Sequence, residues 1–205
     1  MKRNKSQIEK GCETASISPG WIKKKVPDSY ADDDLKRIIL FYVINTPCVA
    51  LSSSGISLTE YGWPKDIWKK PALKQLLFDV AGLEYKKTFF SVNKADETKN
   101  ACEQAKMKKR FHNDRSVEKI VVYRKSGYND FMSVLYHIRN ALAHGRLAMY
   151  EVENSKDIVF ALEDGVKRNN TYYVRARMIL KKSTLIKWID ILECKTEEAK
   201  KLCPN

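Results

Sequence analysis

The sequence predicts a mainly α-helical domain with a small antiparallel β-meander inserted before its last helix. Much of residues 31–144 has the amphipathic spacing of helices, together with residues that start and stop them. β-Branched runs separated by polar turn residues follow at 146–180. One more amphipathic segment comes after these runs, so the predicted order is helices, then the meander, then a helix.

Residues at the segment ends define the predicted helices. Three aspartates precede 35–43, where acidic groups favour a helix start, and Pro71 and Gly82 bracket the next helix. Asn129-Asp130 caps a helix predicted over 131–144, with Gly145 as its stop. The remaining segments are a loop at 46–66, a polar helix at 95–110, a short strand or helix start at 117–123, and a last helix at 185–192 capped by Ser183-Thr184.

Three runs form the predicted meander, at 146–152, 157–162 and 171–180. The polar residues at 154–156 and 165–170 are typical of the turns between them. Arg175 and Arg177 alternate along the third run, so both are predicted to point to one side of the sheet. That side is either a track for RNA phosphates or a solvated strand face.

Length and composition indicate one domain with a short extension. A chain of 205 residues, 43% of them hydrophobic, is long enough to build one core. Residues 1–30 are polar and predicted to be only partly ordered, which leaves a single domain over 31–200. No apolar run approaches the ~18 residues that span a bilayer, and no apolar signal core follows the basic N-terminus. We therefore expect a cytoplasmic protein without a membrane anchor.

The five cysteines argue against a disulfide framework and against a zinc site. They are odd in number and widely spaced, and the sequence has no Cys-x-x-Cys pair. Reduced thiols in a cytosol fit this pattern. We expect neither a metal ion nor another cofactor.

The charge indicates a polyanionic partner. Lys and Arg number 38 against 25 Asp and Glu, which gives a formal net charge of +13. A nucleic acid suits such a chain, because each neutralised phosphate releases counterions. The alternative is that the lysines keep the protein soluble. Charge alone does not choose between RNA, DNA and an acidic protein.

The helix predicted over 131–144 has two faces. At about 100° per residue, its Leu, Ile, Val and Phe side chains gather on one side, which is predicted to be buried. The opposite side, predicted to face solvent, carries Arg139, Asn140, His144 and His137. Arg139 and His144 lie about 7.5 Å apart along the helix axis, so both can reach one phosphate and its neighbouring ribose.

These residue types suit RNA cleavage without a metal ion. When a 2′-hydroxyl attacks the adjacent phosphate, a histidine can move the proton, because it titrates near neutral pH. An arginine can stabilise the charge that builds up on the phosphoryl oxygens. The helix dipole favours the protonated form of His144 in the last turn. A polar helix face with Arg, Asn and His is nevertheless ordinary, and periodicity alone does not establish catalysis.

The run His137-Ile138-Arg139-Asn140-Ala141-Leu142-Ala143-His144-Gly145 resembles the signature of HEPN domains. That signature is an arginine, a polar residue, a few further residues and a histidine near the end of a helix. Four residues separate Arg139 from His144, Asn140 fills the polar position, and Ala143 and Gly145 supply the small residues around the histidine. The resemblance covers about ten residues, and the β-meander after them departs from the minimal helical bundle of the family.

The resemblance implies a helical-bundle RNase of the kind found in toxin–antitoxin, phage-defence and CRISPR systems. Two motif helices would meet across a two-fold homodimer, and each subunit would supply one arginine and one histidine. Arg139 would bind and polarise the phosphate, and His144 would move the proton. Asn140 would orient the attacking hydroxyl or support His144. The product would carry a 2′,3′-cyclic phosphate.

Further residues near the motif are candidates for RNA contacts. His137 lies close to the line of His144 on the same face, and it either assists at the site or is a surface or interface histidine. Tyr136 stacks on a base or packs against a second subunit. Arg146 directly follows the motif and is a candidate for the RNA backbone, as are Arg175 and Arg177.

The sequence therefore predicts a metal-independent RNA endonuclease without a cofactor, acting as a toxin or phage-defence effector. Its expected partners are RNA, a second copy bound through the motif helix, and an antitoxin or defence-system protein. The alternative is a non-catalytic HEPN module that dimerises and binds nucleic acid or a partner protein. A DNA-binding regulator is disfavoured, because the sequence has no convincing helix-turn-helix pair.

Overall fold

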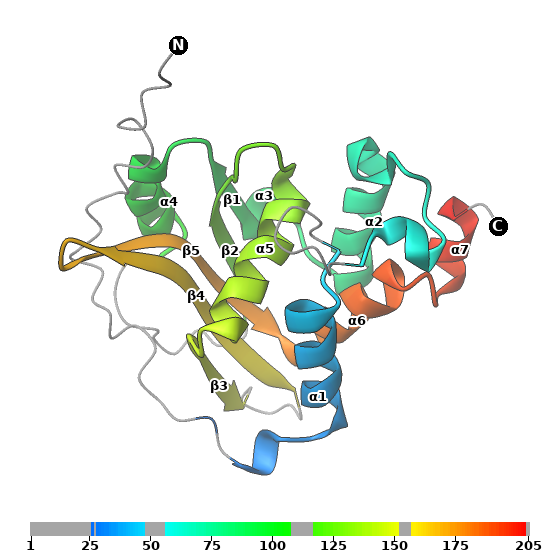
Figure 1. Ribbon diagram of the computed structural model, residues 1–205, viewed down its shortest axis with the longest axis horizontal. Helices are drawn as coiled ribbons and strands as arrows, with labels where there is room; N and C mark the ends of the chain where they lie inside the picture. Colours follow the sequence, from blue (N-terminus) through cyan, green and yellow to red (C-terminus); the bar gives the residue numbers. More distant parts are fainter. Residues whose placement is uncertain (1–25, 27, 48–55, 108–116, 152–156, 204–205) are drawn as a thin grey trace.

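A five-stranded mixed β-sheet with helices on both faces forms the centre of the structure (Figure 1). The computed structural model describes residue 26 and residues 28–47, 56–107, 117–151 and 157–203. The fold is α/β, and the predicted mainly α-helical bundle of HEPN type is wrong. Most of the predicted N-terminal extension, at 1–25 and 27, lies outside the described residues.

The sheet combines strands that precede the motif helix in the sequence with strands that follow it. Its order is β1-β2-β5-β4-β3; β1 and β2 are parallel, and the other pairs are antiparallel. β5 lies between β2 and β4, so strands that precede the motif share one sheet with strands that follow it. The bounds are Phe89–Val92 (β1), Lys119–Tyr123 (β2), Leu147–Glu151 (β3), Ile158–Arg168 (β4) and Thr171–Lys181 (β5).

Helix α5 crosses one face of the sheet, and α1, α2, α6 and α7 gather beside it at one end of the molecule (Figure 1). The α-helices are α1 (Asp33–Ile39), α2 (Pro71–Ala81), α3 (Tyr85–Thr88), α4 (Thr98–Gln104), α5 (Asp130–Ala143), α6 (Lys182–Leu192) and α7 (Glu197–Leu202). A π-helix, η4 (Leu40–Ile44), continues α1, and short 3-10 turns are η3 (Asp28–Tyr30), η6 (Leu58–Tyr61), η7 (Ile67–Lys69) and η8 (Ala95–Glu97). In the described part of the chain, no helix is long and apolar enough to cross a membrane.

Two apolar clusters flank the sheet. The larger joins one face to α1, α2, α5 and α6 and includes Phe131 and Trp188. The smaller packs Ala101 and Cys102 of α4 against the other face. Because side chains alternate along a strand, a sheet covered on both faces buries successive residues. β4 is accordingly buried at each position from Ile158 to Gly165.

Local signals predicted several elements correctly. α2 begins at Pro71 and ends before Gly82, and β3, β4 and β5 form the predicted antiparallel meander. β4 is longer than predicted, because it continues to Arg168 and leaves only Asn169 and Asn170 in the turn. The segment 117–123 contains a strand, β2, rather than a helix start. The helix predicted over 95–110 is shorter than expected, since α4 covers Thr98–Gln104. The elements β1 and α7 were not predicted.

Candidate active site at the end of helix α5

The motif occupies the last turns of α5, whose two ends follow the sequence signals. Asn129 caps the start, where its side chain accepts a hydrogen bond from the backbone N–H of Met132. His144 is the C-cap, and Gly145 follows in the left-handed conformation with φ of +62°. A residue with a Cβ atom would be strained there, so glycine permits the chain to turn directly into β3.

Arg139 is held by an amide and not by a carboxylate. Its Nη1 donates a hydrogen bond to Oδ1 of Asn140 over 3.2 Å. The guanidinium is half-buried and forms no ion pair with any described residue. Because the amide oxygen of Asn140 is neutral, it orients the arginine without cancelling its charge. The cation remains available to an anionic ligand.

His144 presents an exposed imidazole at the end of α5, five residues after Arg139. Its backbone N–H donates to the carbonyl of Asn140 over 3.0 Å, which fixes the main chain. Its side chain makes no hydrogen bond or ion pair with the described part of the chain. The ring is therefore open to a bound molecule.

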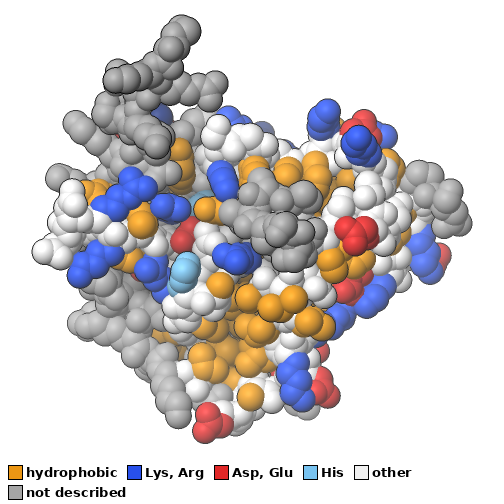
Figure 2. Space-filling view, viewed as in Figure 1, with side chains coloured by type: hydrophobic (Ala, Val, Ile, Leu, Met, Phe, Trp, Pro, Cys, Tyr) orange, Lys and Arg blue, Asp and Glu red, His pale blue; other side chains and the backbone are white. Residues whose placement is uncertain are grey.

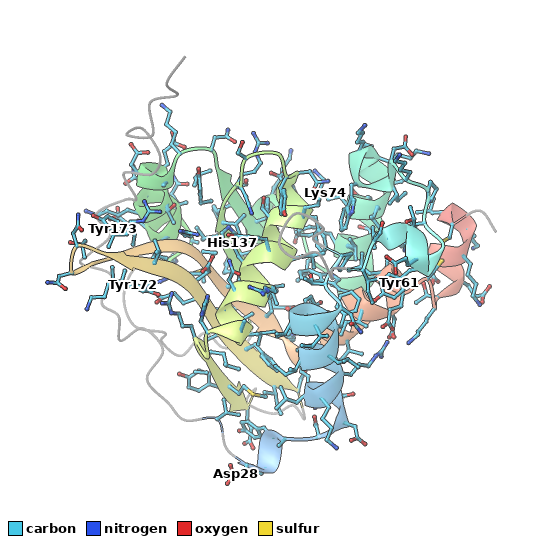
Figure 3. The ribbon with its side chains drawn as sticks, viewed as in Figure 1. Asp28, Tyr61, Lys74, His137, Tyr172 and Tyr173 are labelled. Carbon is cyan, nitrogen blue, oxygen red and sulfur yellow. The ribbon has the colours of Figure 1, made fainter. Side chains whose placement is uncertain are left out.

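A buried carboxylate from the sheet lies beneath the motif. Asp164 of β4 is 3% exposed, and its Oδ2 accepts hydrogen bonds from Nδ1 of His137 over 2.7 Å and from Nδ2 of Asn140 over 3.2 Å. Nε2 of His137 lies 2.7 Å from the carbonyl oxygen of Tyr123 on β2. His137 and Asn140 thereby tie α5 to two strands of the sheet. Figure 3 labels His137 on α5.

The contacts of Asp164 favour its ionised form. Burial alone raises the pKa of the Asp164 carboxyl, but the hydrogen bond and charge interaction with His137 and the hydrogen bond from Asn140 outweigh it and leave that pKa below its usual value. Asp164 is therefore an anion that holds the imidazole ring of His137 and the amide of Asn140 in fixed positions.

The prediction that His137 and Asn140 face solvent is wrong. His137 is 1% exposed and Asn140 is also buried. The apolar face of α5 was correctly expected to be buried, but β2 and β4 cover part of its polar face as well. A direct RNA contact by His137 is excluded in this structure, and Asn140 holds Arg139 instead of reaching an attacking hydroxyl. Arg139 and His144 remain accessible.

Arg146 links the end of α5 to the hairpin of β4 and β5. Its Nη1 donates a hydrogen bond to the carbonyl of Gly165, and its guanidinium carbon lies 5.0 Å from the ring centroid of Tyr172. Tyr172 in turn donates from its hydroxyl to Oε1 of Glu163 over 2.9 Å. The side chain is half-buried. These contacts hold Arg146 against the hairpin, and an RNA contact by this residue remains a prediction.

Arg177 does not lie on an exposed track with Arg175. It is completely buried under α4, where Nε donates to Oε2 of Glu163 over 2.9 Å and Nη1 donates to the carbonyl of Met107 over 2.7 Å. The predicted RNA-binding role of Arg177 is therefore wrong, because the second face of the sheet is covered and not solvated. Arg175 lies nearer the turn of the hairpin at Asn169-Asn170 and is half-buried.

The surface around the motif is basic on one side and apolar on the other. Figure 2 shows an exposed histidine among Lys and Arg side chains, next to a continuous patch of hydrophobic side chains. Ile39, Leu40 and Ile44 of α1 and η4 are exposed hydrophobic residues of the described chain. Among the described residues, no group of three His, Cys, Asp or Glu side chains is arranged to hold a metal ion.

Comparison of the chain with protein-family models, curated proteins and solved structures finds no match. The candidate site therefore depends on the geometry of this chain and on the short resemblance of residues 137–145. Asp164 is the residue of the site that sequence reasoning missed. It lies 24 positions after Asn140, between the strand predicted at 157–162 and the turn predicted at 165–170, and no spacing rule joins it to α5.

Proposed function

We propose that this protein is a metal-independent RNA endonuclease with an active site of HEPN type at the end of α5. The observation that carries the proposal is that the end of α5 bears both an oriented cation and an exposed imidazole. Arg139 is oriented by a hydrogen bond to the neutral amide of Asn140, and His144 is exposed and has no side-chain partner within the described chain. These are the two residue types that RNA cleavage without a metal ion needs.

The proposed reaction is attack of the ribose 2′-hydroxyl on the adjacent phosphate. The new P–O bond forms on the 2′-oxygen as the bond to the 5′-oxygen of the next nucleotide breaks, which leaves a 2′,3′-cyclic phosphate. Arg139 stabilises the charge that develops on the non-bridging oxygens. His144 moves a proton, either from the 2′-hydroxyl or to the leaving oxygen.

Asp164 acts as a positioning residue in this proposal. It contacts Asn140, which contacts Arg139, so the carboxylate sets the direction of the guanidinium without touching the substrate. His137 fixes the other side of the carboxylate and ties it to β2. Such support is required because a displacement of about 1 Å at a catalytic group can cost about 100-fold in rate.

A second copy of the chain is the proposed partner that completes the site. A single copy supplies one Arg139 and one His144, and the reaction needs a proton acceptor and a proton donor on opposite sides of the phosphate. The exposed apolar side chains of α1 and η4 support an interface near α5, since η4 packs against α5. We further propose that the enzyme is cytoplasmic, cuts RNA as a toxin or defence effector, and is held by an antitoxin or defence-system protein.

The test is an RNase assay on total and transfer RNA in the presence of EDTA. Wild type should cleave and leave 2′,3′-cyclic phosphate ends, while His144→Ala should lower the rate about 100-fold or more. His144 is exposed, so this change should alter the free energy of unfolding by less than about 0.5 kcal/mol. Lys86→Ala, an exposed cation on α3, is the matched control and should cleave as wild type does.

The outcomes of this assay are decisive. Cleavage that requires a metal ion, or that survives unchanged in both His144→Ala and Arg139→Ala, would contradict the proposal. A folded wild type that binds RNA but never cuts it would favour the non-catalytic module, in which the two substitutions affect only binding or dimerisation.

A further inference from the structure

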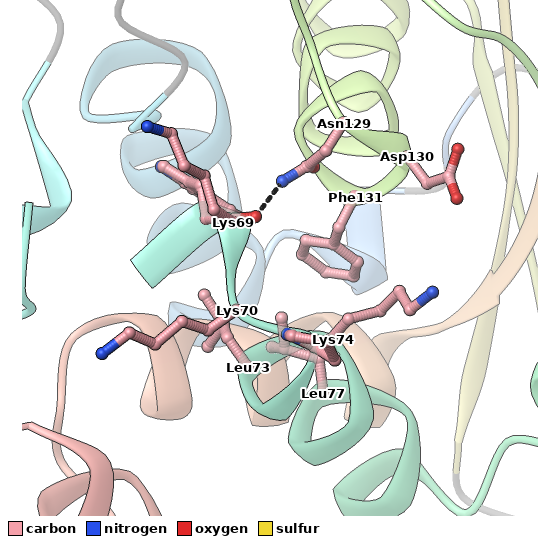
Figure 4. A pocket seen from close by; sticks show the side chains of 10 residues that line it. Lys69, Lys70, Leu73, Lys74, Leu77, Asn129, Asp130 and Phe131 are labelled. Atoms are coloured by element: carbon pink, nitrogen blue, oxygen red, sulfur yellow. Dashed lines mark hydrogen bonds between the residues drawn. The ribbon is translucent and has the colours of Figure 1, made fainter. Parts of the chain in front are cut away.

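A separate cavity lies between the start of α2 and the start of α5 (Figure 4). Its volume is about 170 Å³. It is lined by Trp68, Lys69, Lys70, Pro71, Leu73, Lys74, Leu77, Asn129, Asp130 and Phe131. Because α5 is 14 residues long, its two ends are about 20 Å apart, and the cavity is distinct from the site that contains Arg139 and His144.

The interior of this cavity is apolar and aromatic. Leu73, Leu77 and Phe131 are buried, and Phe131 points into the space between the two helix starts (Figure 4). Trp68 is half-buried, and its ring is 6.5 Å from that of Phe131 with an interplanar angle of 26°. Asn129 fixes this wall, because its side-chain amide donates a hydrogen bond to the carbonyl of Trp68. A flat ring can pack against such a surface.

The rim of the cavity is positively charged. Lys69 and Lys70 are exposed and form no ion pair with the described residues, and Lys74 lies with its Nζ 4.3 Å from the centroid of the Tyr85 ring. Of the described residues that line the cavity, only Asp130 carries a carboxylate. That carboxylate already accepts hydrogen bonds from the hydroxyls of Tyr85 and Ser91. The rim therefore offers ammonium groups to an anion with little competition from within the protein.

We propose that this cavity binds a nucleotide, with the base against Trp68 and Phe131 and the phosphate at Lys69 and Lys70. An inorganic anion alone would leave the apolar interior unfilled, and an uncharged apolar ligand would make no use of the exposed ammonium groups at the rim. Cavities that bind drug-sized ligands are commonly about 300–1,000 Å³, so the space here suits one ring. The nucleotide is either free in solution or one unit of an RNA strand. This inference does not depend on the proposed cleavage reaction.

The experiment is isothermal titration calorimetry with adenosine monophosphate and with 2′-O-methyl hexaadenylate, which lacks the 2′-hydroxyl needed for cleavage. All titrations are made in the Arg139→Ala variant, so that binding at the other end of α5 is separated from binding at the cavity. The double variant Lys69→Glu/Lys70→Glu should weaken binding at least tenfold. Lys65→Glu/Lys187→Glu is the matched control, because it changes the net charge equally at two exposed lysines that do not line the cavity.

The result separates the two sources of the nucleotide. Binding of the monophosphate, lost in Lys69→Glu/Lys70→Glu and kept in the control, would support a free nucleotide. Binding of the hexanucleotide alone with the same dependence would support an RNA strand that reaches this end of α5. Trp68→Leu should weaken whichever ligand binds, with its fold checked by circular dichroism. Absence of binding by both ligands, or equal losses in the two double variants, would overturn the proposal.

Discussion

Replacement of Asp164 by asparagine tests the connection between the sheet and the motif helix. The substitution keeps the volume of the side chain and one oxygen acceptor but removes the negative charge. In the wild type, that charge is 3% exposed and lies 2.7 Å from Nδ1 of His137 and 3.2 Å from Nδ2 of Asn140. The change therefore weakens two buried hydrogen bonds at once.

The expected loss follows from these two contacts. A hydrogen bond to a charged group contributes about 1.5–3 kcal/mol and a neutral one about 0.5–1.5 kcal/mol, so Asp164→Asn should lower the free energy of unfolding by about 2 kcal/mol. For a chain of this size, that corresponds to a fall of about 4–8 °C in the melting temperature. Asp164→Ala removes the carboxylate altogether and leaves both His137 and Asn140 buried without their acceptor, so its loss should be larger, about 3–5 kcal/mol.

The measurements are urea unfolding followed by circular dichroism and RNA cleavage well below the melting temperature. Asp66→Asn, an exposed aspartate, is the control and should stay within about 0.5 kcal/mol of wild type. If Asp164 positions Arg139 through Asn140, the folded Asp164→Asn variant should cleave about tenfold more slowly, which is about 1.4 kcal/mol in the barrier. If Asp164→Asn is as stable as the control, the stabilising role of the hydrogen bonds from His137 and Asn140 to Asp164 is refuted. If Asp164→Asn is less stable but cleaves at the wild-type rate, only the positioning role is refuted.

Three further predictions concern the buried charges. The pKa of Asp164 is lowered in the fold, so the ionised carboxylate stabilises the fold fully at pH values above its ordinary pKa of 3.8. This stabilisation is lost as the pH falls below 3.8. The difference in stability between wild type and Asp164→Asn, measured by urea unfolding, should therefore close at such pH values. Burial raises the pKa of Glu118 above its ordinary value of 4.5, so the charged form destabilises the fold as pH rises, and Glu118→Gln should gain stability relative to wild type between pH 4 and pH 7. Arg177→Met leaves Glu163 buried without its cation and should cost about 3–5 kcal/mol in urea unfolding, of which Arg177→Met/Glu163→Leu should restore a part.

Local elements could be predicted from the sequence because their signals lie within a few residues of each other. The cap at Asn129, the stop at Gly145 and the start at Pro71 are read from single segments, and each lies where it was expected. The pairing of β2 with β5 joins Val121 to Arg177 across the whole motif helix, and no local signal specifies it. Without that pairing, the sequence pattern predicts a helical protein with a small β-meander.

The same limit applies to the candidate site. A helical projection placed Arg139, Asn140 and His144 on one face; in the structure Arg139 contacts Asn140, and His144 is the exposed C-cap of the same helix. The projection shows which residues share a face, but it does not show what packs against that face. The burial of His137 and the role of Asp164 depend on β4, whose Asp164 contacts His137 from 27 positions further along the chain.

Because the chain is synthesised from its N-terminus, the contact between Asn140 and Asp164 can form only late in translation. The motif helix leaves the ribosome before β4, and the carboxylate that holds Asn140 belongs to β4. A nascent chain that ends soon after residue 150 thus carries the motif without its support. We predict that ribosome-bound chains of that length do not cut RNA, and cleavage by such chains would contradict this expectation. In a protein built in this way, the contact that orients Arg139 through Asn140 is completed only after the strand that carries Asp164 has been made.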